Sequence, residues 1–363
     1  MSDLALFLLG PPRIECDGKA IDIRRRKAMA LAIYLAVTGR SHSRDALATL
    51  FWPELDQGRA RAGLRRALAA LKKALGQDFL DVDRETVGLD HDAEIWLDVS
   101  EFQERLAECQ THPHPPEQVC PACLPLLAEA AALYRDHFLA GFTLPDSPAF
   151  DEWQFFHTEG LRDELASALE RLAHGHSDRD EFEPAITCAR RWLALDSLHE
   201  PAHRCLMQLY ARSGQRAAAL RQYAECERVL REELGITPEQ ETTQVYEAIK
   251  EKRELPPSAT PTVPQTTTHK HNLPVQPTPF VGREAVLAEI AGRLQDPDCR
   301  LLTLLGPGGS GKTRLALEAA TGQLGRYEHG VFVVSLAPLS SAESIVPTIA
   351  QAIGVDYAKK DSS

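Results

Sequence analysis

The sequence predicts a mainly α-helical protein of several domains, with short strands near its start and an α/β segment near its end. Three observations support this prediction. Apolar residues recur at helical spacing over most of residues 96–252, strand-like runs separated by turn residues open the chain, and a glycine-rich loop follows an apolar run near residue 306. At 363 residues, 44% of them hydrophobic and 25% charged, the chain has the length and composition of two or three globular domains.

The chain shows no signal for export or for a membrane. It has no run of about 18 apolar residues and no cleavable leader, so we expect a cytoplasmic protein. Its eight cysteines are spread among predicted helices, and disulfides are therefore not expected. The net charge of −12 is unevenly distributed, because residues 13–75 hold 14 Lys and Arg against 6 Asp and Glu. A basic head on an acidic body is typical of a modular regulator.

The first 95 residues have the pattern of short strands, three helices and a hairpin. Ser43 and Asp56 stand where N-caps of the second and third helices are needed. The predicted strands are residues 4–10, 13–17 and 20–23, the predicted helices are residues 25–37, 44–51 and 58–75, and the hairpin pairs residues 79–82 with residues 86–89.

The helix predicted at residues 58–75 has an apolar face and a basic face. Leu64, Leu68, Leu71 and Leu75 form one apolar stripe. The rest of the surface has cations and no carboxylate, so we expect its negative partners to come from elsewhere, most simply from phosphates. The alternative is an ordinary basic surface helix. The six cations are Arg59, Arg61, Arg65, Arg66, Lys72 and Lys73.

In a helix-turn-helix protein the last helix of the set enters the major groove, and a following hairpin can act as a wing. With Phe51, Trp52 and Pro53 before residues 61–75, this part resembles the winged-helix effector domain of response regulators, in the version that heads bacterial transcriptional activators of the antibiotic-regulator type. The resemblance implies binding to double-stranded promoter DNA. Candidates for groove or backbone contact are Arg59, Arg61, Arg65 and Arg66, and candidates for phosphate contact are Lys72, Lys73 and Arg84.

Residues 96–254 are predicted to be nearly all helical and partly repetitive. Residues 165–195 form a helical pair interrupted near residues 175–179, and residues 202–234 form a second pair interrupted at residues 213–215. Such pairs resemble tetratricopeptide repeats, which bind proteins. Two segments resemble the bacterial transcriptional activator domain that follows the winged helix in the same family, which implies self-association or contact with RNA polymerase; the alternative is a generic helical domain. These segments are residues 131–142 and 230–242.

A cluster of cysteines and histidines interrupts the helical pattern at residues 109–123. Cys120 and Cys123 have the spacing that lets two thiolates share one tetrahedral zinc ion, and Cys109 with His112 repeats the spacing. His114 is an alternative imidazole ligand. The predicted site is structural zinc, with two alternatives: a connector with incidental Cys and His, or a redox Cys-x-x-Cys, although the βαβ context of the latter is missing.

Residues 255–277 are rich in Pro and Thr and are predicted to form a semi-extended linker. An apolar run at residues 301–305 follows, predicted as a buried strand. The pattern G-x-x-x-x-G-K-T then runs from Gly306 to Thr313, ahead of a helix predicted at residues 314–321. Strand, loop and helix in this order are the context of a P-loop.

In a P-loop the glycines let backbone N–H groups surround the phosphates, Lys312 would reach the β- and γ-phosphates, and Thr313 would bind Mg²⁺. Residues 278–284 resemble the start of the nucleotide-binding domain of signal-transduction ATPases with numerous domains, and residues 330–335 would be its second strand. The candidate nucleotide-binding residues are Val281, Gly282, Arg283, Gly306, Gly308, Gly309, Ser310, Gly311, Lys312 and Thr313.

This module departs from the family because the chain has no Walker B strand ending in acids, no sensor residues and no helical lid. Without the acid that holds Mg²⁺ and orients water, hydrolysis has no visible apparatus. We therefore expect a fragment or truncated gene product, with a vestigial nucleotide domain as the alternative. In an intact version the module would sense ATP or ADP with Mg²⁺, and we do not expect an enzyme.

The predicted fold is thus mainly α: an N-terminal winged helix-turn-helix, a central tetratricopeptide-like helical repeat domain and a C-terminal partial α/β P-loop module. The predicted function is a DNA-binding transcriptional activator, and the alternative is a signalling ATPase with an N-terminal protein-interaction scaffold. The predicted domains are residues 1–95, 96–254 and 278–363, with a linker at residues 255–277.

Overall fold

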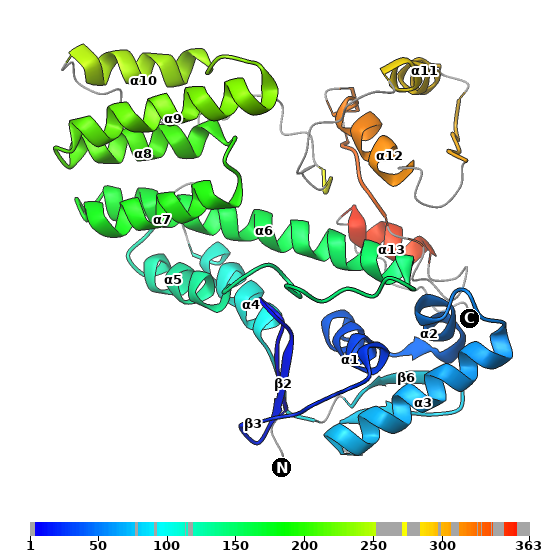
Figure 1. Ribbon diagram of the computed structural model, residues 1–363. Coiled ribbons are helices and arrows are strands. Elements are labelled where there is room, and N and C mark those ends of the chain that lie inside the picture. Colours follow the sequence, from blue (N-terminus) through cyan, green and yellow to red (C-terminus); the bar gives the residue numbers. More distant parts are fainter. Residues whose placement is uncertain are drawn as a thin grey trace. The chain divides into compact units, whose positions relative to one another are not determined.

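The computed structural model of the protein (Figure 1) forms two compact units, Met1–Pro261 and Thr262–Ser363. Within the described residues, no helix combines the length and the hydropathy that a membrane span requires. The structure describes residues 4–76, 79–90, 93–112, 114, 119–251, 271–273, 284–296, 299–305, 312–324, 326–327, 329–334, 336 and 345–353.

The first unit opens with a four-stranded sheet of order β3-β2-β1-β7. The β2–β3 hairpin turns at Asp17 and Gly18, whose positive φ angles of 50° and 71° fit a tight hairpin turn. β1 is antiparallel to β2 and parallel to β7, with Leu4 opposite Ile95. The sequence predicted the first two strands. It placed the third strand at residues 20–23, where the structure has a two-residue strand that includes only Ala20 of this range, and it missed β7. The bounds are Leu4–Phe7 for β1, Arg13–Cys16 for β2, Lys19–Ala20 for β3 and Ile95–Leu97 for β7.

Three helices follow as predicted. The side chain of Ser43 accepts a hydrogen bond from the Ala46 N–H at 3.1 Å, and that of Asp56 accepts one from the Arg59 N–H at 3.0 Å, so both predicted N-caps are confirmed. The leucine stripe of the third helix is buried, as its spacing required. The helices are α1, Arg26–Thr38; α2, Arg44–Phe51; and α3, Gln57–Leu75.

The predicted hairpin is present and gains a third strand. β5 pairs with β6, and β6 also pairs with the two-residue strand β4, placed directly before α2. Asp83 holds the turn, because one of its carboxylate oxygens accepts hydrogen bonds from the Glu85 and Thr86 N–H groups at 2.6 and 2.5 Å. The bounds are His42–Ser43 for β4, Leu80–Val82 for β5 and Thr86–Leu89 for β6.

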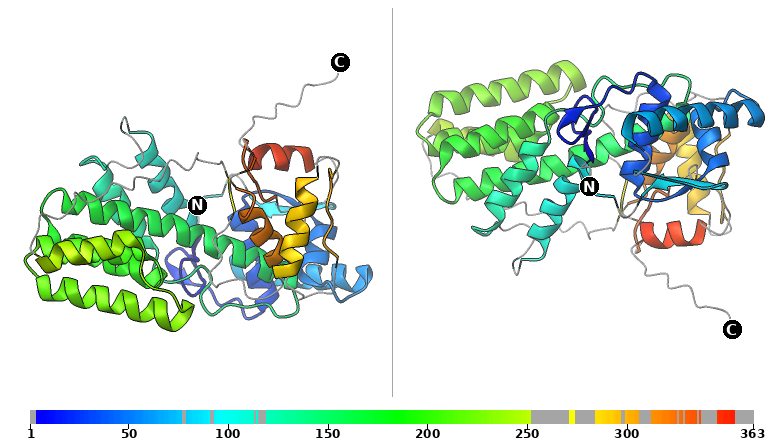
Figure 2. Two further views of the ribbon diagram at one scale, coloured as in Figure 1. Left: turned by 90° about the horizontal axis from the view of Figure 1, so that it is seen from above. Right: turned by 90° about the horizontal axis from the view of Figure 1, so that it is seen from below.

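The remainder of the first unit is helical, and α7 to α10 lie side by side in successive layers (Figures 1 and 2). The predicted break at residues 213–215 is confirmed. The other break comes later than predicted, because the helix continues through Gly175, whose missing side chain leaves room for Val119 and Leu124. The helices are α4, Asp98–Gln110; α5, Cys123–Leu133; α6, Pro148–Ser177; α7, Phe182–Leu195; α8, Glu200–Arg212; α9, Arg216–Leu234; and α10, Gln240–Glu251.

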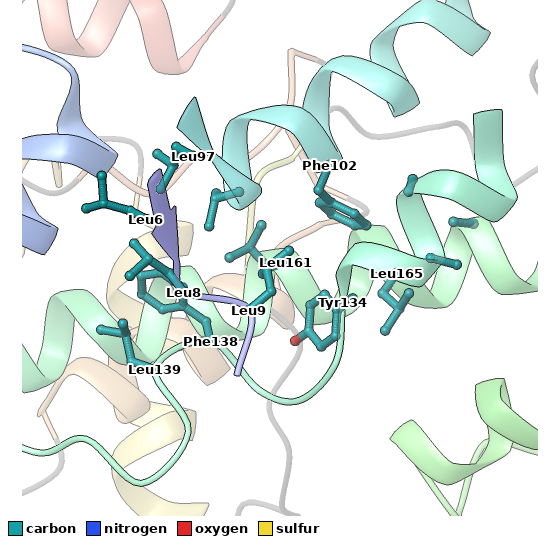
Figure 3. Packing of buried hydrophobic residues seen from close by; sticks show 14 of the residues in the cluster. Leu6, Leu8, Leu9, Leu97, Phe102, Tyr134, Phe138, Leu139, Leu161 and Leu165 are labelled. Carbon is teal, nitrogen blue, oxygen red and sulfur yellow. The ribbon is translucent and has the colours of Figure 1, made fainter. Parts of the chain in front are cut away.

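One hydrophobic core runs from the N-terminal sheet into the helical part (Figure 3). Leu8 and Leu9, just after β1, are completely buried, and Leu9 forms a bridge with Phe138. The carboxylate of Asp98, at the start of α4, accepts hydrogen bonds from both leucine N–H groups at 2.8 and 2.9 Å. The segment after β1 is therefore as much a part of the helical region as of the N-terminal sheet.

In the second unit, α11 (Glu284–Gln295), α12 (Lys312–Thr321) and α13 (Ile345–Ala352) are helical. The predicted helix after the P-loop is thus present. The strands predicted at residues 301–305 and 330–335 are not: the described residues there form no ladder. A strand needs a hydrogen-bonded neighbour. Without one the apolar run remains exposed to solvent, with Leu301 85% exposed and Leu305 89% exposed.

His271, Asn272 and Leu273 fall inside the predicted linker. His271 forms a bridge with Val331, and the Asn272 side chain exchanges two hydrogen bonds with the Val333 backbone, at 2.6 and 2.8 Å. These three residues therefore pack within the second unit. The other residues of the predicted linker, 255–270 and 274–277, lie outside the described residues.

Candidate nucleic-acid interface

α3 presents most of its basic side chains to solvent. Burial of the leucine stripe against the N-terminal domain turns the opposite side of the helix outward. Lys72 is half-buried. The exposed cations of this helix are Arg59, Arg61, Arg65, Arg66 and Lys73.

Two of the predicted DNA contacts have an acidic partner within the same domain. Arg61 forms two hydrogen bonds, of 2.6 and 2.7 Å, with the carboxylate of Asp45 in the first turn of α2. The hydrogen bond from Arg61 holds the pKa of Asp45 below its usual value. Arg59 lies 3.3 Å from Asp56, the cap of its own helix. Both pairs are exposed, and such pairs are screened by salt and stabilise the fold little.

The other four cations of α3 have no such partner. In the part of the chain that the structure describes, Arg65, Arg66, Lys72 and Lys73 form no ion pair within 4.0 Å. Acids do lie nearby, since Asp45, Asp83 and Glu85 line the same groove as Arg65, and Asp146 lines the same hollow as Arg66, but none of them forms an ion pair with these four cations. They remain available to an external anion.

The wing places a further cation beside α3. Arg84, exposed in the turn between β5 and β6, lines one surface groove together with Arg65 and Arg61. Arg44 also lines this groove. It links α2 to the turn between β5 and β6, because its guanidinium donates a 2.8 Å hydrogen bond to the Asp83 carbonyl. The sequence did not point to Arg44, whose place at the first turn of α2 showed no sign of a contact with the wing.

A close contact fixes α3 against the end of α2. Trp52 lies over Gly63, and a Cβ atom on Gly63 would come within 2.7 Å of the indole Cε2. The ammonium of Lys27 lies 5.1 Å from the centre of the same indole ring. Trp52 therefore helps to fix the position of the basic helix.

The basic block at residues 24–27 does not face outward as a unit. Arg26 donates a 2.7 Å hydrogen bond to the Thr143 carbonyl, and Lys27 lies 2.7 Å from Asp146. Arg24 pairs with Asp22. Arg26 and Lys27 therefore anchor the N-terminal domain to the loop before α6, which carries the acid and carbonyl partners that sequence spacing could not reveal.

The predicted nucleotide site is described only in part. Lys312 is the first residue of α12, at the helix N-terminus that a P-loop lysine requires. It lines a cavity of about 750 Å³ whose other walls are mainly apolar, among them Ile290, Leu294 and Val331. Outside the described residues lie Val281, Gly282, Arg283, Gly306, Gly308, Gly309, Ser310 and Gly311, and likewise the side chain of Thr313.

The Cys and His cluster assembles with one change from the predicted set. One potential ligand atom each from His112, His114, Cys120 and Cys123 lies within 4.8 Å of the others. Cys109 is not in this group: its thiol is buried and lies 3.8 Å from the Cys123 carbonyl. His114, the alternative ligand in the sequence pattern, thus takes the place of Cys109, because Cys109 is still on α4 and faces the helical core.

Comparison with known proteins gives a match in the helical part of the first unit. Residues 97–250 match the family model of the bacterial transcriptional activator domain. The chain is 27% identical over 365 residues to the regulatory protein AfsR of Streptomyces griseus and 28% identical over 381 residues to AfsR of Streptomyces coelicolor. These alignments cover 97% and 99% of the chain but 36% and 37% of the relatives, so the chain spans just over a third of their length.

A solved structure shares the fold. The structure of Mycobacterium tuberculosis EmbR in complex with a low-affinity phosphopeptide aligns with 71% of this chain and 68% of its own, with a TM-score of 0.56 and 21% identity. At that identity the likeness concerns the architecture alone.

Proposed function

We propose that this chain, whose residues 97–250 match the model of the bacterial transcriptional activator domain, is a transcriptional regulator that binds promoter DNA through α3 and the β5–β6 hairpin, the predicted wing. The observation that carries the proposal is the open basic face of α3: four cations without an acidic partner in the described structure, beside Arg84 of the wing. Phosphates spaced along a duplex are the natural counterpart of such a face. The helix and wing stand in the order used by winged-helix proteins.

The positions of Arg65 and Arg66 on α3 also suggest separate roles for these residues in DNA binding. Arg65 lies toward the wing, and Arg66 lies on the other side, in a hollow next to Trp52 and Lys27. Contacts on both flanks would position the helix in a groove, and arginine is the side chain that can read guanine there. When DNA binds, Arg61 and Arg59 would leave their exposed ion pairs with Asp45 and Asp56 and would contact phosphates instead.

Binding of labelled duplex to residues 1–252, followed by fluorescence anisotropy at two salt concentrations, tests the proposal. The duplex comes from the upstream region of the protein's own gene. Replacing Arg65 and Arg66 together by Ala removes two contacts, so we expect at least a tenfold loss of affinity and a salt slope shallower by about 1.8. The matched control is the double variant of Arg179 and Arg221, exposed arginines of the helical domain.

Equal affinities of the two double variants would overturn the DNA-binding proposal, provided that circular dichroism shows both to be folded. Unchanged binding between low and high salt would also contradict it, because several phosphate contacts release counterions.

The helical domain would link DNA binding to its output by self-association or by contact with RNA polymerase. The support is the domain match and the stacked helical pairs, an architecture that commonly binds proteins. Sedimentation of residues 1–252 with and without duplex separates a dimer on DNA from a monomer that recruits polymerase.

The second unit would bind ATP or ADP with Mg²⁺ as a sensor. The support is the glycine-rich pattern in the sequence and the start of α12 at Lys312. Titration with a fluorescent ADP analogue, compared between the wild-type chain and Lys312→Ala, measures this binding directly. Nucleotide turnover by the wild-type chain would favour an ATPase instead.

A further inference from the structure

Four side chains with soft donor atoms converge where the end of α4 meets the start of α5. His112 and His114 follow α4, Cys120 precedes α5, and Cys123 is its first residue. His112 Nδ1 lies 3.0 Å from the Cys123 sulfur and 3.4 Å from the Cys120 sulfur. His114 Nε2 lies 3.2 Å from the Cys123 sulfur, and the two sulfurs are 3.5 Å apart.

These separations match the edges of a zinc tetrahedron. With Zn–S bonds of about 2.3 Å and Zn–N bonds of about 2.0–2.1 Å, the edges of a regular Cys₂His₂ site are about 3.3–3.8 Å. The His112–Cys120 and Cys120–Cys123 distances of 3.4 and 3.5 Å lie within this range, and the two histidine distances to Cys123, 3.0 and 3.2 Å, are shorter. All four donor atoms lie within 4.8 Å of one another, so small side-chain movements are enough for one metal ion to contact all of them.

The surroundings favour a structural metal over a catalytic one. Cys123 is buried and the other three side chains are half-buried, and the four protein ligands fill a tetrahedron without an open position for water or substrate. A disulfide is the competing chemistry for the two cysteines. Their 3.5 Å separation is far from the S–S bond length of about 2.05 Å, and both are free thiols.

The residues next to the site pack against α6. Val119 and Leu124, the neighbours of Cys120 and Cys123, are the groups that a Cβ atom on Gly175 would meet, at 3.1 and 2.8 Å. The loop and the start of α5 are therefore pressed against α6. A link between the two sides of the loop would hold α4, α5 and α6 in one arrangement.

We propose that His112, His114, Cys120 and Cys123 form a Cys₂His₂ structural zinc site that joins α4 to α5 in the activator domain. On binding, Zn²⁺ displaces the two thiol protons, which leave to solvent, and forms two Zn–S and two Zn–N bonds without any redox change. Cys109 stays outside the coordination sphere and supports it through its contact with the Cys123 carbonyl. The proposal is independent of DNA binding.

Metal analysis of the full chain, purified without added metal or chelator, tests the site. We expect one zinc ion per chain in the wild type and in Cys109→Ser, and almost none in Cys120→Ser and in His114→Ala. Cys109→Ser is the matched control, because it removes a neighbouring thiol that the proposal leaves unligated.

Replacement of zinc by Co²⁺ supplies a second readout on the wild type, which does not depend on a variant folding. Absorption bands of tetrahedral Co²⁺, with charge-transfer intensity for two thiolates, are expected. Intensity for three thiolates, or loss of metal from Cys109→Ser but not from His114→Ala, would overturn this ligand set. A folded, metal-free wild type that gives no Co²⁺ bands, or a Cys120–Cys123 disulfide found by mass spectrometry, would overturn the site altogether.

Discussion

Gly63 sets how closely α3 approaches the end of α2. The indole of Trp52 occupies the space where any other residue would have its Cβ atom, with the nearest ring atom at 2.7 Å. The indole belongs to a rigid side chain that also contacts Phe51 and Lys27, so it cannot yield without moving its neighbours. The basic helix therefore depends on the absence of one methyl group.

We expect Gly63→Ala to destabilise the first unit by about 1–3 kcal/mol, the usual cost of overpacking, measured by urea unfolding of residues 1–252. Gly160→Ala is the control. Gly160 lies in α6, and no described atom comes within 4 Å of the position that its Cβ atom would take, so the same substitution there should stabilise the helix by up to about 1 kcal/mol. Equal effects at both positions would contradict the role assigned to Trp52.

His42 makes the stability of the N-terminal domain depend on pH. It is buried beside Tyr34, and its Nε2 lies 2.7 Å from the Thr38 hydroxyl, which itself donates to the Tyr34 carbonyl. Burial, with a smaller contribution from Arg40, lowers the pKa of His42 to about 4. The unfolded chain therefore binds a proton that the folded chain excludes when the pH lies between 6.5 and about 4.

It follows that stability is full above pH 6.5 and falls as the pH drops toward 4. The pKa difference corresponds to a total loss of about 3 kcal/mol, of which about 2 kcal/mol has been lost at about pH 5. Urea unfolding of wild type and His42→Gln at about pH 7.5 and about pH 5 measures it, and the glutamine variant should lose less stability over this interval than the wild type. Parallel losses in the two proteins would show that other groups dominate.

At the scale of elements, sequence patterns predicted some features of α3 and missed others. The spacing of Leu64, Leu68, Leu71 and Leu75 predicted the buried face, and Asp56 was predicted to cap the helix, because both signals are local. The Arg61–Asp45 pair was not predicted, since its partners are on different helices. The same holds for β4 and β7, two short strands that exist only through their neighbours.

The cap of α3 can be tested by itself. Asp56→Ala removes the side-chain acceptor for the Arg59 N–H and should cost about 1 kcal/mol of unfolding free energy, whereas Asp56→Ser keeps an acceptor and should cost less. Urea unfolding of residues 1–252 measures both. If the serine variant is as unstable as the alanine variant, the hydrogen bond is not what Asp56 contributes.

The cysteine and histidine cluster shows the same limit over a loop. The spacing of Cys120 and Cys123 was sufficient to predict that their sulfur atoms lie close together. The choice between Cys109 and His114 was not decided by spacing, because both are close enough in sequence. The last turn of α4 decides it by directing the Cys109 side chain into the core.

At the scale of the molecule, the basic helix and residues 97–250, the part that matches the activator domain, belong to one unit. β1 pairs with β7, the carboxylate of Asp98 binds the Leu8 and Leu9 N–H groups, and the Ser147 hydroxyl donates a 2.5 Å hydrogen bond to the Leu50 carbonyl. The basic face of α3 is therefore held in a set position relative to the activator domain within this unit.

A fragment that ends at residue 95 loses most of β7 and all of Asp98, and leaves Leu8 and Leu9 without cover. We expect this fragment to be unfolded or aggregated, whereas residues 1–252 should unfold in a single calorimetric transition. Differential scanning calorimetry of the two fragments checks this. A stable, monomeric fragment of residues 1–95 would show that the shared core is not required by the N-terminal domain.

The second unit differs, since its predicted strands depend on partners in a sheet. Residues 301–305 have the apolar composition of a buried strand, yet Leu301 and Leu305 are exposed and the described residues form no ladder there. The helix predicted after the glycine-rich pattern needs no such partner and is present as α12.

Local sequence was sufficient to specify the three helices α1 to α3, the caps at Ser43 and Asp56, the β5–β6 hairpin and the basic face of α3, because these follow from contacts between residues a few positions apart. Long-range packing was needed to turn Arg26 and Lys27 toward the activator domain, to pair Arg61 with Asp45, and to complete the first sheet with β7. Each of those outcomes joins residues distant in the chain, and the free energy that selects them comes mainly from the apolar surface buried when the elements that carry them pack together.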